Sequence, residues 1–140
     1  MPIYAGGRPH PLRDPCSQVL LLVAEHPLAF STDAEVVQEL LHRFLGLHQW
    51  ERGKPVFDGF VGLMEGRVKP LRAGDVVQAA LLADRYPRLS VRDLVHVAVM
   101  QRIGSIRIIS ADQDFSDIPQ LQRLDPANLA AWRQQIEQQS

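Results

Sequence analysis

The sequence predicts an α/β fold in which a small, mostly parallel sheet is covered by helices. Three observations predict it. Helical periodicity recurs along most of the 140 residues, short apolar runs rich in β-branched residues lie between the helical segments, and prolines or glycines mark the boundaries. Strands that alternate with helices are typical of parallel sheets, because a parallel neighbour needs a long crossover connection. There is no internal repeat and no low-complexity linker, so residues 1–140 are expected to form one domain.

Apolar residues at helical spacing predict helices over residues 12–25, 34–50, 55–65, 75–86, 90–104 and 127–138. The second begins with the pattern of a capping box, in which Thr32 is the N-cap residue and Glu35 lies at the third helical position. The fifth begins at Ser90 and ends at Gly104, a residue type that often follows the last helical turn. Its apolar residues lie on most sides, which predicts a buried helix.

Three short segments between these helices predict strands. The clearest is the β-branched run at residues 106–109, Ile-Arg-Ile-Ile. Residues 68–71 predict an edge strand, because Pro70 has no backbone N–H and is tolerated only at a sheet edge. Residues 121–124 predict one more strand.

The composition is that of an ordinary globular protein. Apolar residues make up 46% of the chain, charged residues 22%, and the mean hydropathy is −0.10, which argues against a disordered chain. The apolar runs are far shorter than the roughly 20 residues that a membrane span needs, so no membrane partner is expected. Cys16 is the lone cysteine and cannot form an internal disulfide, which suits the reducing cytoplasm.

The basic residues are nearly all arginine. Of the 15 Lys and Arg residues, only Lys54 and Lys69 are lysine, while the net charge of the chain is −1. Arginine binds phosphate with two parallel hydrogen bonds, but a GC-rich genome explains the same bias. Arg85, Arg88 and Arg92 come just before Asp93 and are the candidates for binding RNA; the alternative is a solvated helix end.

Acidic residues follow or begin several of these elements. Asp93 lies three residues after Ser90, so it is either a capping-box residue or an acid at the edge of the core. Asp112 and Asp114 follow the 106–109 strand, and ligands of parallel sheets bind at the carboxyl ends of strands, although an Asp turn fits equally well. Glu39 lies away from the apolar stripe of its helix and is by default a surface residue. Together these carboxylates suggest a site for Mg²⁺ or Mn²⁺ that could support phosphodiester hydrolysis.

Three stretches of the chain resemble the PIN-domain ribonucleases in order and approximate spacing, and above all the VapC toxins of toxin–antitoxin pairs: STDAEVVQELLHRF, YPRLSVRDLVHVAVM and IRIISADQDFSDIP. The resemblance covers nearly the whole chain and implies a three-layer α/β fold with a parallel sheet. It implies Mg²⁺- or Mn²⁺-dependent cleavage of RNA by a homodimer that an antitoxin protein silences. It also implies that Glu39, Asp93 and Asp112 hold the metal and that Asp114 is an accessory catalytic acid or an alternative to Asp112.

One part of the family pattern has no counterpart in the chain. The family begins with a central strand that ends in Asp-Thr-Asn, whereas MPIYA at residues 1–5 matches only the part that follows it. The first central strand and its metal-binding aspartate are therefore expected to be absent. Loss of a central strand would leave buried backbone groups unpaired, at about 1–3 kcal/mol each.

This departure leaves more than one hypothesis open. The leading one is a PIN-domain ribonuclease in which residue 1 is an internal position of a longer reading frame. The second is a PIN-derived binding or dimerisation module that no longer cleaves RNA. A third, a receiver-like signalling domain with an acidic pocket, is disfavoured because no lysine follows a late strand.

Overall fold

The computed structural model describes residues 10–139. The match of MPIYA to the family lies outside these residues. The elements are, in chain order, α2 (Arg13–Glu25), the 3-10 turn η1 (Pro27–Ala29), β1 (Thr32–Asp33), α3 (Ala34–Gly46), α4 (Trp50–Leu63), β2 (Val68–Lys69), α5 (Ala73–Arg85), α6 (Val91–Ile103), β3 (Arg107–Ile109), η2 (Gln113–Asp117), β4 (Gln122–Leu124), η3 (Pro126–Asn128) and α7 (Leu129–Glu137). The fold is mixed α/β and mostly helical, with short parallel strands, as the sequence predicts.

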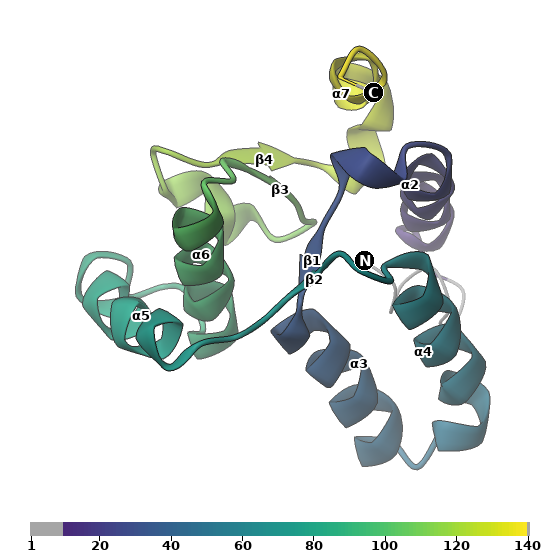
Figure 1. Ribbon diagram of the computed structural model, residues 1–140, viewed down its shortest axis with the longest axis horizontal. Coiled ribbons are helices and arrows are strands. Elements are labelled where there is room, and N and C mark those ends of the chain that lie inside the picture. Colours follow the sequence, from purple (N-terminus) through teal and green to yellow (C-terminus); the bar gives the residue numbers. More distant parts are fainter. Residues whose placement is uncertain (1–9, 140) are drawn as a thin grey trace.

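The strands form two separate parallel pairs. β1 pairs with β2, and β3 pairs with β4. In Figure 1 the β1–β2 pair lies at the centre, with α5 and α6 on one side and α2 and α4 on the other. Two apolar clusters follow this division: α2, α3, α4 and α7 supply most of one, and α5, α6 and η2 supply most of the other.

A cavity of about 640 Å³ lies between the two strand pairs and is lined by residues of β1, β2, β3 and β4. On either side of β3, the Ile106 carbonyl accepts from Gln122 N–H at 2.7 Å and the Ser110 N–H donates to the Leu124 carbonyl at 3.2 Å. Backbone groups of successive residues in a strand point to opposite sides, so those of Arg107 and Ile109 point away from β4. By the same alternation the N–H of Asp33 points away from β2, because Thr32 N–H donates to Arg67 O. Arg107, Ile109 and Asp33 all line the cavity, so two strand edges border it. Within residues 10–139, no further strand pairs with either of these edges.

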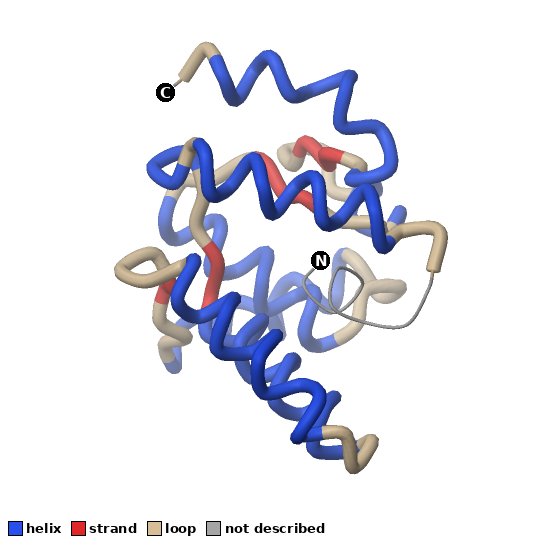
Figure 2. Tube along the Cα trace, turned by 90° about the vertical axis from the view of Figure 1, so that its right-hand side faces the viewer, coloured by secondary structure: helices blue, strands red, loops and turns tan. Residues whose placement is uncertain are grey.

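The predicted helix over 34–50 is wrong at its end, and the helix over 55–65 is wrong at its start. α3 ends at Gly46, and α4 begins at Trp50. Between them His48 has φ 52°, a left-handed conformation that breaks the helix and that the helical periodicity does not reveal. Pro55 is therefore inside α4 rather than at its start. Figure 2 shows the resulting α3–α4 hairpin extending away from the strands to the tip that this turn forms.

The predicted cap of α3 is also wrong. The N-cap residue is Asp33, whose side chain accepts a hydrogen bond from Val36 N–H at 3.0 Å. Thr32 belongs instead to β1, where its N–H pairs with the β2 segment. The caps of α6 are confirmed: Ser90 accepts from Asp93 N–H at 3.2 Å, and Gly104 ends the helix with φ 74°.

None of the helices within residues 10–139 combines the length and the hydropathy that a membrane crossing requires.

Gly53→Ala is expected to destabilise the protein. Gly53 is buried where α4 crosses α3, and a Cβ at this position would overlap the ring and the Cβ of Phe44. Overpacking of this kind costs about 3 kcal/mol, which lowers the melting temperature by roughly 10 °C. Gly59→Ala, on the same helix with no atom within 4 Å of its added Cβ, is the matched control and should raise stability slightly. Thermal unfolding of both variants measures this; equal melting temperatures would contradict the packing of α3 on α4.

Candidate active site

Three of the acids predicted from the sequence line the cavity between the strand pairs: Glu39, Asp93 and Asp112. They come from three segments. Glu39 lies on α3, which follows β1 directly; Asp93 lies in the first turn of α6; and Asp112 follows β3. Asp112 and the helix of Glu39 thus follow the carboxyl ends of strands, where open parallel sheets bind ligands.

Asp93 has the environment of an acid held at the edge of the core. It is half-buried, and the residues that follow it on α6 are almost all buried. Burial raises the pKa of Asp93, and the negative charge of Asp112 raises it further, against the opposing effects of Ser90 and His96. The charge coupling shows that the carboxylates of Asp93 and Asp112 repel each other, a repulsion that a bound cation would relieve.

Glu39 is not the free surface residue of the default interpretation. Its carboxylate lies 3.2 Å from a guanidinium nitrogen of Arg92, and its side chain is one-third exposed. It also lines a second hollow, of about 600 Å³, together with His42, Arg43 and Arg92. Glu39 therefore stands between the acidic cavity and a partly basic hollow.

Asp112 and Asp114 have different positions. Asp112 is the N-cap of η2, and its carboxylate accepts a hydrogen bond from Asp114 N–H at 2.9 Å. Asp114 is not among the residues that line the cavity. The turn interpretation and the site interpretation of Asp112 are therefore compatible, since one oxygen caps the turn while the residue faces the cavity.

The donor set fits a divalent cation in its chemistry. Carboxylate oxygens are the ligands that Mg²⁺ and Mn²⁺ prefer, and Asp93 and Asp112 are close enough for their charges to interact. Within residues 10–139, however, no three acidic, histidine or cysteine side chains are grouped closely enough to hold a metal ion. Glu39 would have to exchange Arg92 for the cation to complete such a group.

The three candidate RNA-binding arginines differ in their contacts. Arg92 pairs with Glu39, and Arg88 lies 3.8 Å from Asp117, with both of those ion pairs well exposed. Arg85 is exposed in the last turn of α5. Exposed ion pairs contribute little energy, so a phosphate could replace the acidic partners of Arg88 and Arg92.

Sequence reasoning missed Asp33 as a residue of this cavity. His96 Nδ1 lies 2.6 Å from Asp33 Oδ2, and the two side chains are only 12% and 10% exposed. Burial alone would lower the pKa of His96, but the hydrogen bond to Asp33 and the charges of Asp33, Asp93 and Glu39 outweigh it, so the pKa lies above its ordinary value. The two residues are 63 positions apart, and no local pattern connects them.

Comparison with known proteins gives matches over most of the chain. The PIN domain family model matches residues 3–121. The VapC ribonuclease Mb1869c of Mycobacterium bovis is 34% identical over 124 residues, which cover 89% of this chain and 94% of the relative. Ribonuclease VapC23 of Mycobacterium tuberculosis is 37% identical over 112 residues, 79% of this chain and 86% of the relative, and Ribonuclease VapC7 of the same species is 30% identical over 126 residues, 89% of this chain and 86% of the relative. No solved structure matches the chain.

Proposed function

The chain belongs to the PIN-domain family, and from that premise we propose that it is a metal-dependent endoribonuclease of the VapC toxin type. One observation supports this above the others. Glu39, Asp93 and Asp112, which are far apart in the sequence, line one cavity beside the carboxyl ends of β1 and β3. Relatives that are named ribonucleases match over most of their length, which favours the same chemistry here.

The acids have distinct roles in this proposal. Asp93 and Asp112 hold Mg²⁺ or Mn²⁺, and Glu39 joins them after releasing Arg92. When bound, the cation supplies charge neutralisation at the phosphodiester and favours ionisation of the attacking water. Asp114 supports catalysis indirectly, because its N–H holds one oxygen of Asp112 in place.

The arginines near the start of α6 provide the contacts to RNA. Arg85 is exposed, and Arg88 and Arg92 are released from weak, exposed ion pairs when a phosphate approaches. In the second hollow next to Glu39, Arg43 and Arg92 offer further phosphate contacts beside the acidic Glu35 and Glu39.

The remaining parts of the proposal follow from the resemblance of the sequence to VapC toxins. The chain acts in the cytoplasm as one PIN domain over residues 1–140, forms a homodimer, and is held inactive by a cognate antitoxin protein. Its two proposed partners are thus an RNA substrate and a protein that blocks the acidic cavity.

Cleavage of RNA by the purified chain tests the proposed function. The chain is expected to cut single-stranded RNA internally when Mn²⁺ or Mg²⁺ is added and to stop when EDTA removes the metal, because the carboxylates alone cannot neutralise the phosphodiester. Gel analysis of an end-labelled RNA measures the products. Products that persist in EDTA, or that do not change with either metal, would contradict a metal-dependent nuclease.

The second candidate is a PIN-derived binding or dimerisation module that has lost cleavage. The separation of the described strands into two pairs favours it, because within residues 10–139 no strand joins the pairs and fixes the spacing of the acids. In that case the purified chain binds RNA but forms no cleavage products when Mn²⁺ or Mg²⁺ is added.

A further inference from the structure

Asp33 makes two contacts that connect separate elements. Its Oδ1 atom caps α3 by accepting from Val36 N–H at 3.0 Å, and its Oδ2 atom lies 2.6 Å from Nδ1 of His96 on α6. Both side chains of the Asp33–His96 pair are nearly buried. One carboxylate therefore holds the first turn of α3 against the middle of α6.

The Asp33–His96 pair lies between the two helices that carry proposed metal-binding acids. His96 follows Asp93 by three residues on α6, about one helical turn, and Glu39 lies on the helix that Asp33 caps. A shift of His96 relative to Asp33 would move the helix of Asp93 relative to the helix of Glu39. In a packed interior such a shift passes to neighbouring side chains because few voids absorb it.

The charged groups around His96 are mostly acidic. Asp93 lies on its own helix, Asp33 and Glu39 belong to β1 and α3, and Asp112 and Lys69 line the same cavity from the segment after β3 and from β2. The carboxylates of Asp33, Asp93 and Glu39 together favour the protonated imidazole. When it is protonated, His96 places a positive charge among these acids.

We propose that His96 is a positioning residue of the carboxylate site: through Asp33 it fixes the first turn of α3 against α6 and so sets the separation of Glu39 from Asp93. This rests on the proposed function, because the separation matters only if the acids share a cation. His96 touches neither substrate nor metal in this role.

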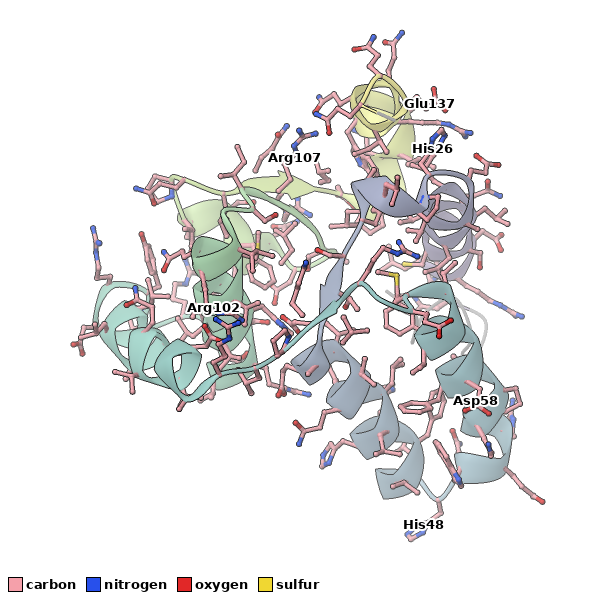
Figure 3. All side chains as sticks on the ribbon, viewed as in Figure 1. His26, His48, Asp58, Arg102, Arg107 and Glu137 are labelled. Carbon is pink, nitrogen blue, oxygen red and sulfur yellow. The ribbon has the colours of Figure 1, made fainter. Side chains whose placement is uncertain are left out.

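Two substitutions separate the hydrogen bond from the charge. His96→Ala removes both, whereas His96→Asn keeps a donor near the position of Nδ1 and removes only the charge. The matched control is His48→Asn, at the tip of the α3–α4 hairpin far from the cavity (Figure 3), where asparagine tolerates the left-handed backbone.

The first measurement is hydrogen exchange at the Val36 amide, which Asp33 caps. We expect at least about tenfold faster exchange in His96→Ala and near wild-type exchange in His96→Asn and His48→Asn. The second is the affinity for Mn²⁺ by calorimetry, which should fall about tenfold in His96→Ala and recover in His96→Asn, as for residues that orient metal ligands.

The pH dependence of stability gives a readout that tests the charge. Because the folded chain raises the pKa of His96 above 6.5, the ion pair contributes its full stability below about pH 6.5 and loses it as the pH rises through the folded-state value. The wild-type melting temperature should therefore fall over this range relative to that of His96→Asn. This comparison remains available even where His96→Ala does not fold.

The outcomes distinguish the two proposals. If the wild-type chain binds Mn²⁺ and His96→Ala changes neither Val36 exchange nor Mn²⁺ affinity, the positioning role is wrong and the proposed function stands. Parallel pH profiles of wild type and His96→Asn would likewise overturn the ion pair. If His96→Ala loosens Val36 while the wild-type chain binds no Mn²⁺, the proposed function fails and the link between α3 and α6 remains.

Discussion

Asp93→Asn is expected to lower metal-dependent RNA cleavage by more than about 100-fold while the fold stays intact, since even residues that only orient a ligand cost 10–100-fold. The amide has the shape of the carboxylate but no charge to attract a cation. Burial, together with the charge of Asp112, raises the pKa of Asp93, so its ionised form is less favourable in the folded chain than in the unfolded chain at neutral pH. The melting temperature of Asp93→Asn should therefore equal or exceed that of the wild type.

Loss of RNA cleavage without loss of thermal stability distinguishes a functional acid from a residue that the fold needs. A loss of activity with a lower melting temperature would indicate a damaged fold, whereas a loss with equal or higher stability indicates a functional acid. Asp58→Asn is the matched control, because Asp58 is exposed on α4 and forms a surface ion pair with Lys54 (Figure 3). Cleavage at the wild-type rate by Asp93→Asn would exclude Asp93 from the active site.

Supplying a strand to the cavity between the strand pairs is expected to produce the largest gain in stability. We propose a chain extended before residue 1 by about five apolar, β-branched residues that end in aspartate. The N–H groups of Arg107 and Ile109 on one edge, and that of Asp33 on the other, which no strand within residues 10–139 pairs, would then gain partners at roughly 1 kcal/mol per hydrogen bond. With burial of the new apolar side chains, a gain of about 3 kcal/mol raises the melting temperature by roughly 10 °C.

The same extension is expected to raise metal-dependent cleavage, because its aspartate would add a carboxylate to the site of Asp93 and Asp112. An extension that ends in asparagine should give the stability without the activity. A third extension with proline at alternate positions should give neither, since proline cannot donate to the neighbouring strands. If the apolar extension changes neither the melting temperature nor the cleavage rate, the cavity is not a strand site.

The local elements follow from the sequence to a large extent. The periodicity predicts α2, α5 and α6 to within two residues at each end, and Ser90 and Gly104 cap α6 as expected. These features depend on neighbours within one helical turn, which the sequence displays directly. The break between α3 and α4 could not be predicted, because the residue that takes the left-handed conformation after α3 is His48 and not a glycine.

The candidate site is likewise visible in the sequence only in part. The sequence shows the acids that could form a site, and the resemblance to PIN domains explains why Glu39, Asp93 and Asp112 belong together. Only the tertiary structure decided that Glu39 pairs with Arg92, that Asp114 lies off the cavity, and that Asp33 both caps α3 and holds His96. The physical reason is distance along the chain: an ion pair between residues 63 positions apart leaves no periodic or local pattern, because it exists only after the helices pack.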